Sequence, residues 1–216
     1  MISTGGAESI LPSQLVDDAH VRDERAFLLL YGDAPILLIR IPPGDAELQH
    51  GLEAMEAGSG RIPFRTEAVS EPRMVAAPRR SERPGDPAQL ASELAGGTYF
   101  AFSMRKRTDD KALASDRVTV GRTSNRDLVL RHASVSKFHA WFEADADATV
   151  SVTDAESKNQ TFINATALAP RTKTRVAPGA LVRFGSVECR LWTARNLWAV
   201  LRRRHPSGGR VLDRAT

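Results

Sequence analysis

The sequence predicts a mainly β protein in which an antiparallel β-sandwich fills the second half and one helix follows it. From Thr98 onward, short apolar segments of strand length alternate with polar clusters. Turn-forming pairs that begin at Pro178 and Gly185 separate some of these segments. Many short strands at such spacing are typical of a sandwich. A closing helix is predicted over residues 194–204, where Leu197 and Leu201 share one face.

Each predicted strand follows the same pattern: three to eight residues rich in Val, Leu, Phe and Thr lie between turn-like residues. The segments are residues 99–106, 117–120, 127–130, 138–144, 149–153, 161–163, 174–176, 181–184 and 188–192.

The first part of the chain gives a weaker prediction. Residues 1–25 are polar and aperiodic, so we expect them to be poorly ordered. Residues 26–31 and 34–41 are apolar and separated by a Gly-Asp pair, which favours two strands around a tight turn. A short helix is predicted over residues 45–57 with Asp45 as its N-cap. This part is interpreted as a small α+β module, partly disordered, or an arm that packs on the second domain.

Composition divides the chain into four parts. Residues 1–65 form an N-terminal region of uncertain fold, and residues 66–97 are rich in Pro, Arg and Glu, as linkers are. Within this linker, one or two helical turns are predicted over residues 86–94. Residues 98–193 form the sandwich, and residues 194–216 form the helix and a basic tail.

Charge is unevenly distributed over the 216 residues, whose net charge is +4. Residues 1–95 hold 9 Lys and Arg against 15 Asp and Glu, residues 96–193 hold 15 against 10, and residues 194–216 hold 6 against 1. The second half is therefore basic, which favours an anionic partner such as a phosphopeptide, a nucleic acid or an acidic protein surface.

Several classes of protein are not expected. The single cysteine, Cys189, cannot form an internal disulfide, and the five histidines are scattered without metal-ligand spacing. We therefore expect no metal and no cofactor. The chain shows no secretory signal, and its most apolar stretch, residues 27–41, is too broken to span a membrane. A cytoplasmic protein is expected, and the high Ala and Arg content suggests a GC-rich bacterial genome.

Three polar clusters between residues 120 and 164 carry the strongest functional signal. They hold donors that a phosphate or a peptide backbone could accept: Arg122, Ser136, Lys137, Lys158 and Asn159. Loops held by rigid strands are the usual place for binding residues. The pattern therefore predicts a binding site built from several loops at one side of the sandwich.

The order of these motifs resembles the forkhead-associated (FHA) domain. The matching residues are Gly121-Arg122, Ser136-x-x-His139, Asp154-x-x-Ser157-x-Asn159-x-Thr161 and Asn164. The resemblance covers residues 98–193 and implies a β-sandwich of FHA type that binds phosphothreonine in a partner protein, without catalysis.

The resemblance also implies roles for single residues. Arg122, Ser136 and Lys137 would bind the phosphate, and Asn159 with Lys158 would hold the peptide. A guanidinium can bind a phosphate with two parallel hydrogen bonds, which a lysine cannot do. The residues expected to give structural support are Gly121, His139, Asp154, Ser157, Thr161 and Asn164.

Two positions depart from the family pattern. Gln160 follows Asn159 where the family usually has Gly, and Ala165 follows Asn164 where it again usually has Gly. If position 160 needs a positive φ, glutamine there adds strain of roughly 1 kcal/mol, or the turn is rebuilt.

These observations predict a phosphothreonine-peptide-binding adaptor whose partner is a Ser/Thr kinase or a kinase substrate. Two alternatives stay open. Gln160 and Ala165 suggest a scaffold that has lost phosphate recognition, and the basic charge suggests nucleic-acid binding, although no nucleic-acid motif is present. An enzyme is not expected, since the sequence holds no P-loop or kinase signature. The oligomeric state and the sequence preference around the phosphothreonine are left open.

Overall fold

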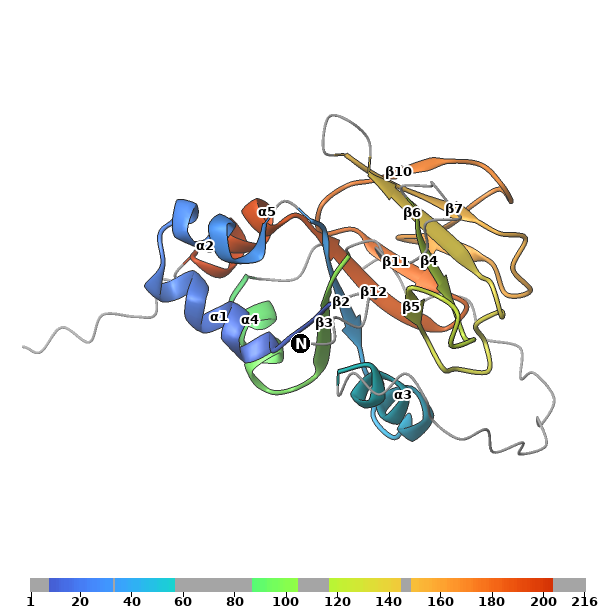
Figure 1. Cartoon of the computed structure of the whole chain (residues 1–216), viewed down its shortest axis with the longest axis horizontal. Coiled ribbons are helices and arrows are strands. Elements are labelled where there is room, and N and C mark those ends of the chain that lie inside the picture. The colour runs from blue at the N-terminus through green and yellow to red at the C-terminus, as the bar shows by residue number, and fades with distance from the viewer. Residues whose placement is uncertain (1–7, 33, 57–86, 105–116, 145–148, 204–216) are drawn as a thin grey trace, which may run out of the picture.

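The structure, a computed structural model, places two stacked sheets beside a layer of helices (Figure 1). It describes residues 8–32, 34–56, 87–104, 117–144 and 149–203. In these residues the mainly β prediction is confirmed, and each of the segments predicted as strands from residue 99 onward contains a strand.

The larger sheet has seven strands, each antiparallel to its neighbours. In spatial order they are β1 (Glu8–Ile10), β3 (Tyr99–Ser103), β2 (Ile36–Arg40), β12 (Val187–Trp192), β11 (Leu181–Phe184), β8 (Thr161–Ile163) and β9 (Thr166–Ala167). Of these, β1 and β9 were not predicted; the two residues of β9 are exposed and carry no apolar pattern.

The smaller sheet has five strands. In spatial order they are β10 (Thr174–Val176), β7 (Val150–Asp154), β6 (Ala140–Ala144), β4 (Arg117–Gly121) and β5 (Leu128–Val129). The β4–β5 pair is parallel, with Val120 opposite Leu128. The sandwich was expected to be antiparallel throughout, and this pair is the exception. The pair is short: both residues of β5, Leu128 and Val129, pair with the end of β4.

One hydrophobic core lies between the two sheets. It contains Val120 and Phe142 from the smaller sheet and Leu37 and Leu191 from the larger one, all of them almost fully buried. Helix α3 (Ala46–Glu56) contributes two further residues of this core, Leu48 and Leu52. The predicted N-cap is present, since Asp45 Oδ1 accepts a 3.0 Å hydrogen bond from the backbone N–H of Leu48.

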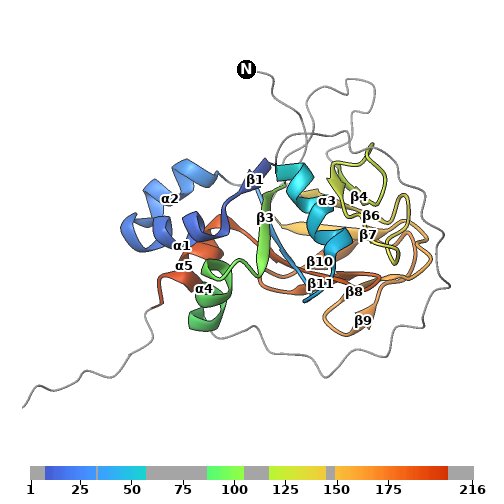
Figure 2. The same cartoon turned by 90° about the horizontal axis from the view of Figure 1, so that it is seen from below.

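A second core lies on the outer face of the larger sheet. Four helices cover this face: α1 (Pro12–Val21), α2 (Glu24–Tyr31), α4 (Pro87–Ala95) and α5 (Ala194–Leu201). Figure 2 shows them together at one side of the sheet. The sheet residues that pack against the helices are Ile36, Leu38, Tyr99, Ala101 and Trp192. Because β2 has a core on each face, four consecutive residues of it are buried.

Two predictions for the first part of the chain are wrong. Residues 26–31 form part of helix α2 instead of a strand, because Phe27 and Tyr31, four residues apart, make its buried face. Asp23 caps this helix by accepting a 2.8 Å hydrogen bond from the N–H of Ala26. Residues 8–21, expected to be poorly ordered, form β1 and α1, which begins at Pro12. Proline suits the first turn of a helix, where its missing N–H costs nothing.

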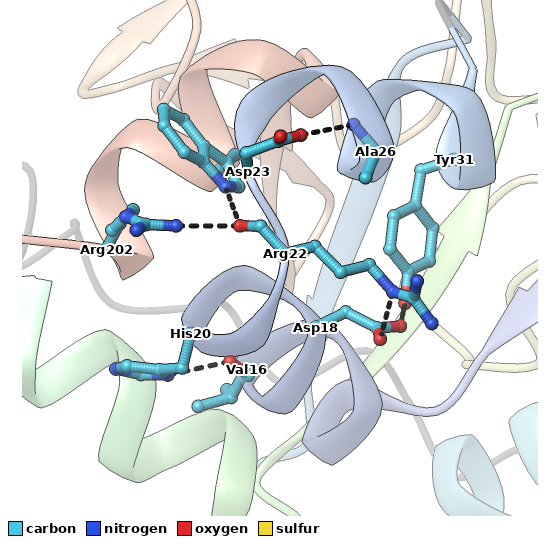
Figure 3. Close-up of polar contacts among 9 residues, drawn as sticks. Val16, Asp18, His20, Arg22, Asp23, Ala26, Tyr31 and Arg202 are labelled. Atoms are coloured by element: carbon cyan, nitrogen blue, oxygen red, sulfur yellow. Dashed lines mark hydrogen bonds and ion pairs between the residues drawn. The ribbon is translucent and has the colours of Figure 1, made fainter.

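A polar cluster fixes α1 and α2 against α5 (Figure 3). The carbonyl oxygen of Arg22 accepts hydrogen bonds from Trp198 Nε1 at 3.2 Å and from Arg202 at 2.7 Å. On the inner side, the Tyr31 hydroxyl donates to Asp18 at 2.7 Å, and this bond lowers the pKa of the Asp18 carboxyl. The turn between α1 and α2 is thus joined to the C-terminal helix.

The N-terminal region contributes directly to the sandwich, since β2 lies between β3 and β12 in the larger sheet. The predicted helical turns before the sandwich are present as α4, and the predicted closing helix is present as α5. Most of the predicted linker, residues 66–86, lies outside the described residues. Among the described helices, none has the length and apolar character required to cross a membrane.

Candidate functional site

Three loops come together at one end of the sandwich. They are residues 122–127 between β4 and β5, residues 130–139 between β5 and β6, and residues 155–160 between β7 and β8. The backbone N–H of Arg122 donates to the carbonyl of Ser136 at 3.0 Å, and the N–H of Lys158 donates to the Ser136 hydroxyl oxygen at 3.0 Å. Ser136 therefore contacts both of the other loops.

Gly121 permits the close approach of the first two loops. A Cβ atom at this position would lie 2.3 Å from the carbonyl oxygen of Lys137, a distance that no side chain can tolerate. The same carbonyl accepts a 2.9 Å hydrogen bond from the Thr123 hydroxyl. A glycine before Arg122 is thus required by packing between the two loops.

His139 joins the second and third loops through a fully buried ring. Its Nδ1 accepts a 3.0 Å hydrogen bond from the backbone N–H of Ser136, so Nε2 must carry the proton and donate to the Gln160 carbonyl at 3.2 Å. Burial lowers the pKa of His139, while the Gln160 carbonyl and the charge of Asp154 partly oppose this shift. The ring is therefore neutral and structural.

Asp154 organises the turn that leads to Asn159. This buried carboxylate accepts hydrogen bonds from the Ser157 N–H at 3.0 Å, from the Ser157 hydroxyl at 2.7 Å and from the Thr161 hydroxyl at 2.6 Å. A buried carboxylate needs such partners to offset its loss of hydration. The three donors bridge the start and the end of the loop that carries Asn159.

Asn159 is held by the neighbouring loop. Its Nδ2 donates a 2.9 Å hydrogen bond to the carbonyl of Ser134. A carboxamide has two N–H donors and an acceptor oxygen, so this bond leaves one donor and the oxygen for a ligand. The next residue, Gln160, has a φ of 58°. This is the positive φ at which strain was expected for a glutamine in this position.

The loops expose cations that lack acidic partners. Arg122, Lys137 and Lys158 are exposed, and none of them makes an ion pair within the described part of the chain. The nearby carboxylates are engaged elsewhere: Asp127 accepts from the N–H and hydroxyl of Thr119, and Glu156 pairs with Arg171 at 2.9 Å. The surface formed by the three loops, called the rim below, is consequently electropositive and suited to an anion.

One predicted support residue lies away from this rim. Asn164 is at the other end of β8, where its Oδ1 accepts from the N–H of Leu181 at 3.2 Å. Its own N–H donates to the Leu181 carbonyl at 2.7 Å, and its φ is 54°. It therefore shapes the β8–β9 turn and does not touch the three loops.

Sequence reasoning missed Ser134 and its partners. The Ser134 hydroxyl contacts His132 Nδ1 at 2.7 Å and the Ser186 hydroxyl at 2.8 Å, while its carbonyl holds Asn159. A Cβ on Gly185 would lie 2.4 Å from that carbonyl. The Ser134–Ser186 contact joins residues 52 positions apart, so no local pattern indicates it. The only signal in the sequence was Gly185, which was interpreted as part of a simple turn.

The family model of the FHA domain matches residues 118–185. This part of the chain is therefore similar to an FHA domain, and the matched residues include all three loops described above. No curated protein sequence matches the chain.

Solved structures, among them FHA domains, are similar to part of the chain. The FHA domain of protein CT664 from Chlamydia trachomatis has 24% identity over 37% of this chain and 80% of that chain, with a TM-score of 0.33. The N-terminal FHA domain of S. cerevisiae Rad53p, solved with a phosphothreonine peptide, has 18% identity, covers 36% and 67%, and has a TM-score of 0.34. Mycobacterium tuberculosis EmbR, solved with a low-affinity phosphopeptide, has 23% identity, covers 38% and 21%, and has a TM-score of 0.33.

Proposed function

We propose that the protein is a non-catalytic adaptor that binds phosphothreonine peptides at the rim of the three loops. The observation that carries the proposal is the set of exposed cations without acidic partners among the described residues, Arg122, Lys137 and Lys158, on three loops that meet at Ser136. The match of this segment to the FHA domain supports the same conclusion. In this proposal Arg122 binds the phosphate, with Ser136 and Lys137, and Asn159 with Lys158 contacts the peptide backbone.

The chemistry of the rim suits a dianion on a peptide. A phosphothreonine carries a charge of about −1.5 to −2 and three strong acceptor oxygens. Hydrogen bonds to charged groups contribute roughly 1.5–3 kcal/mol each. Three or four of them, reduced by the entropy of ordering a peptide, correspond to an affinity of about 1 μM. Such an affinity suits reversible signalling downstream of a Ser/Thr kinase, with the kinase or its substrate as partner.

The proposal is tested by titrating the full chain with a degenerate phosphothreonine peptide library and with its unphosphorylated twin. We expect the phosphorylated library to bind and the unphosphorylated one to stay below detection. Arg122→Ala should lower the affinity at least about thirty-fold, since it removes roughly 2 kcal/mol or more of charge-assisted bonding. Arg203→Ala removes an exposed cation in the helical layer and should change the affinity less than about two-fold.

The outcome separates the adaptor from the alternatives. Equal binding of the two libraries would contradict phosphate recognition and favour a scaffold that only keeps the sandwich. Two observations motivate that alternative. Asn159 already donates a hydrogen bond to the Ser134 carbonyl, and Gln160 has a strained positive φ. Binding of single-stranded nucleic acid that weakens steeply with salt, in place of peptide binding, would favour the nucleic-acid alternative.

A further inference from the structure

The loop rim carries more positive charge than one phosphate requires. The three loops, residues 122–127, 130–139 and 155–160, contain five lysine or arginine side chains and two carboxylates; one of the five, Arg131, packs beside Gly51 of α3, which leaves four cations for the rim. Glu156 is paired with Arg171, and the Asp127 carboxylate, which keeps its negative charge, accepts hydrogen bonds from Thr119. A single phosphothreonine supplies at most about two negative charges. The excess indicates that the natural ligand brings a second anionic group.

Arg126 is the cation best placed to receive it. Its guanidinium carbon lies 4.7 Å from the centre of the Phe138 ring, and its side chain passes beside Gly121, one residue before Arg122. Phe138 follows Lys137, and 38% of its side chain is exposed, which is unusual for a phenylalanine. The guanidinium is thus held over an aromatic ring, close in sequence to the residues proposed to bind the phosphate.

Arg126 has unused donors in this position. Its Nε atom is buried without a hydrogen-bond partner, and the side chain makes no ion pair among the described residues. Neighbouring Asp127 makes no ion pair with it among the described residues, because the Asp127 carboxylate is turned to Thr119, whose N–H and hydroxyl both donate to it. A half-buried cation without a counter-ion is costly, and a ligand carboxylate or phosphate would relieve that cost.

A second arginine on the same face of the smaller sheet provides the comparison. Arg117 stacks on Trp141 at 4.9 Å, and Trp141 in turn stacks on Phe138 with ring centres 5.8 Å apart. Unlike Arg126, Arg117 is paired with Glu143 at 3.1 Å. The two arginines share a stacking environment and differ in whether their charge is already satisfied.

We infer that Arg126, held on Phe138, selects phosphothreonine peptides with an acidic side chain near the phosphothreonine. This inference rests on the proposed function and adds a specificity residue to it. Arg126 is not required for binding the phosphate itself. It contributes only when the peptide presents a carboxylate or a second phosphate within its reach.

The test is a scan of phosphothreonine peptides in an alanine background. Asp, Glu or phosphoserine is placed at each position from three residues before to four residues after the phosphothreonine, and each peptide is titrated against the full chain. We expect at least one position where the acidic residue raises affinity about five-fold. Arg126→Ala should abolish that gain and leave the affinity for the all-alanine peptide within about two-fold. Comparing Asp with phosphoserine at that position shows which anion is preferred.

Controls make the result decisive. Arg117→Ala should keep the full acidic preference, and Arg126→Gln, which removes the positive charge but keeps a polar side chain, should lose it as Arg126→Ala does. If every peptide binds without acidic preference, or if the preference survives in both Arg126 variants, this inference is overturned and the proposed function stands. If no phosphothreonine peptide binds, both are overturned.

Discussion

At residue scale, Gln160 stores strain that a single substitution can release. Its φ of 58° lies in the left-handed region, and the conformation is imposed because its carbonyl accepts hydrogen bonds from Gly185 at 3.1 Å and His139 at 3.2 Å. The side chain is exposed, so removing it loses little packing. Left-handed backbone costs a residue with a Cβ roughly 1 kcal/mol or more.

Gln160→Gly should therefore stabilise the protein. Greater flexibility of glycine in the unfolded chain offsets part of the gain, so we expect an increase of about 0.5 kcal/mol in the free energy of unfolding. Urea unfolding measures this, and Gln160→Ala is the matched control, because alanine keeps the Cβ and should bring no gain. Equal stability of the Gly and Ala variants would show that the turn is not strained.

His139 gives the protein a stability that depends on pH. Its pKa is lowered in the folded state from the usual 6.5, with burial as the main cause. The unfolded chain therefore binds a proton more readily as the pH falls below about 6.5. The contribution of neutral His139 to the free energy of unfolding is therefore complete above that pH. It declines as the pH is lowered toward the folded pKa.

The His139→Asn variant isolates this effect from the other histidines. It should be less stable than the wild type at pH 7.5, since it loses the two hydrogen bonds that join Ser136 to Gln160. The difference in the free energy of unfolding between the two proteins should shrink as the pH falls from 7 to 5. A difference that stays constant over this range would contradict a neutral, buried ring.

At element scale, the strands that carry the site were predictable because their signals are local. The turn motifs around Arg122, Ser136 and Asn159 lie within 38 consecutive positions, and each adjoins a short alternating segment. The neighbours that hold them were not predictable. Ser134 acts through Ser186, far along the chain, and no pattern within either loop reveals this contact.

The error at residues 26–31 has a similar origin. The apolar run there includes Leu29 and Leu30, which looks like a strand, yet these two side chains are 80% and 48% exposed. Phe27 and Tyr31 make the buried face, against a helical layer whose other members, α1, α4 and α5, come from distant parts of the chain. A short apolar run does not distinguish strand from helix until the surface it packs against is known.

At the scale of the whole molecule, the segment that matches the FHA domain packs on residues that precede it. The family match begins at residue 118, whereas β2, at residues 36–40, lies inside the larger sheet between β3 and β12. Four residues of β2, Ile36 to Ile39, are fully buried. Two of them face the core of the sandwich and the other two face the helical layer. One strand thus serves both cores, and removing it would expose β3 and β12 together.

A fragment of residues 98–216 should consequently not fold stably, even though it contains every proposed binding residue. Burial of one Ile or Leu side chain contributes roughly 1.5–3 kcal/mol, so the four from β2 amount to roughly 6–12 kcal/mol, comparable with the whole stability of a domain at about 5–15 kcal/mol. Circular dichroism and thermal unfolding of the fragment test this. A chain beginning at residue 8 keeps β1 and β2 and should unfold as cooperatively as the full protein. If the fragment instead melts cooperatively near the temperature of the full chain and binds phosphothreonine peptide, β2 is dispensable and the two cores are independent.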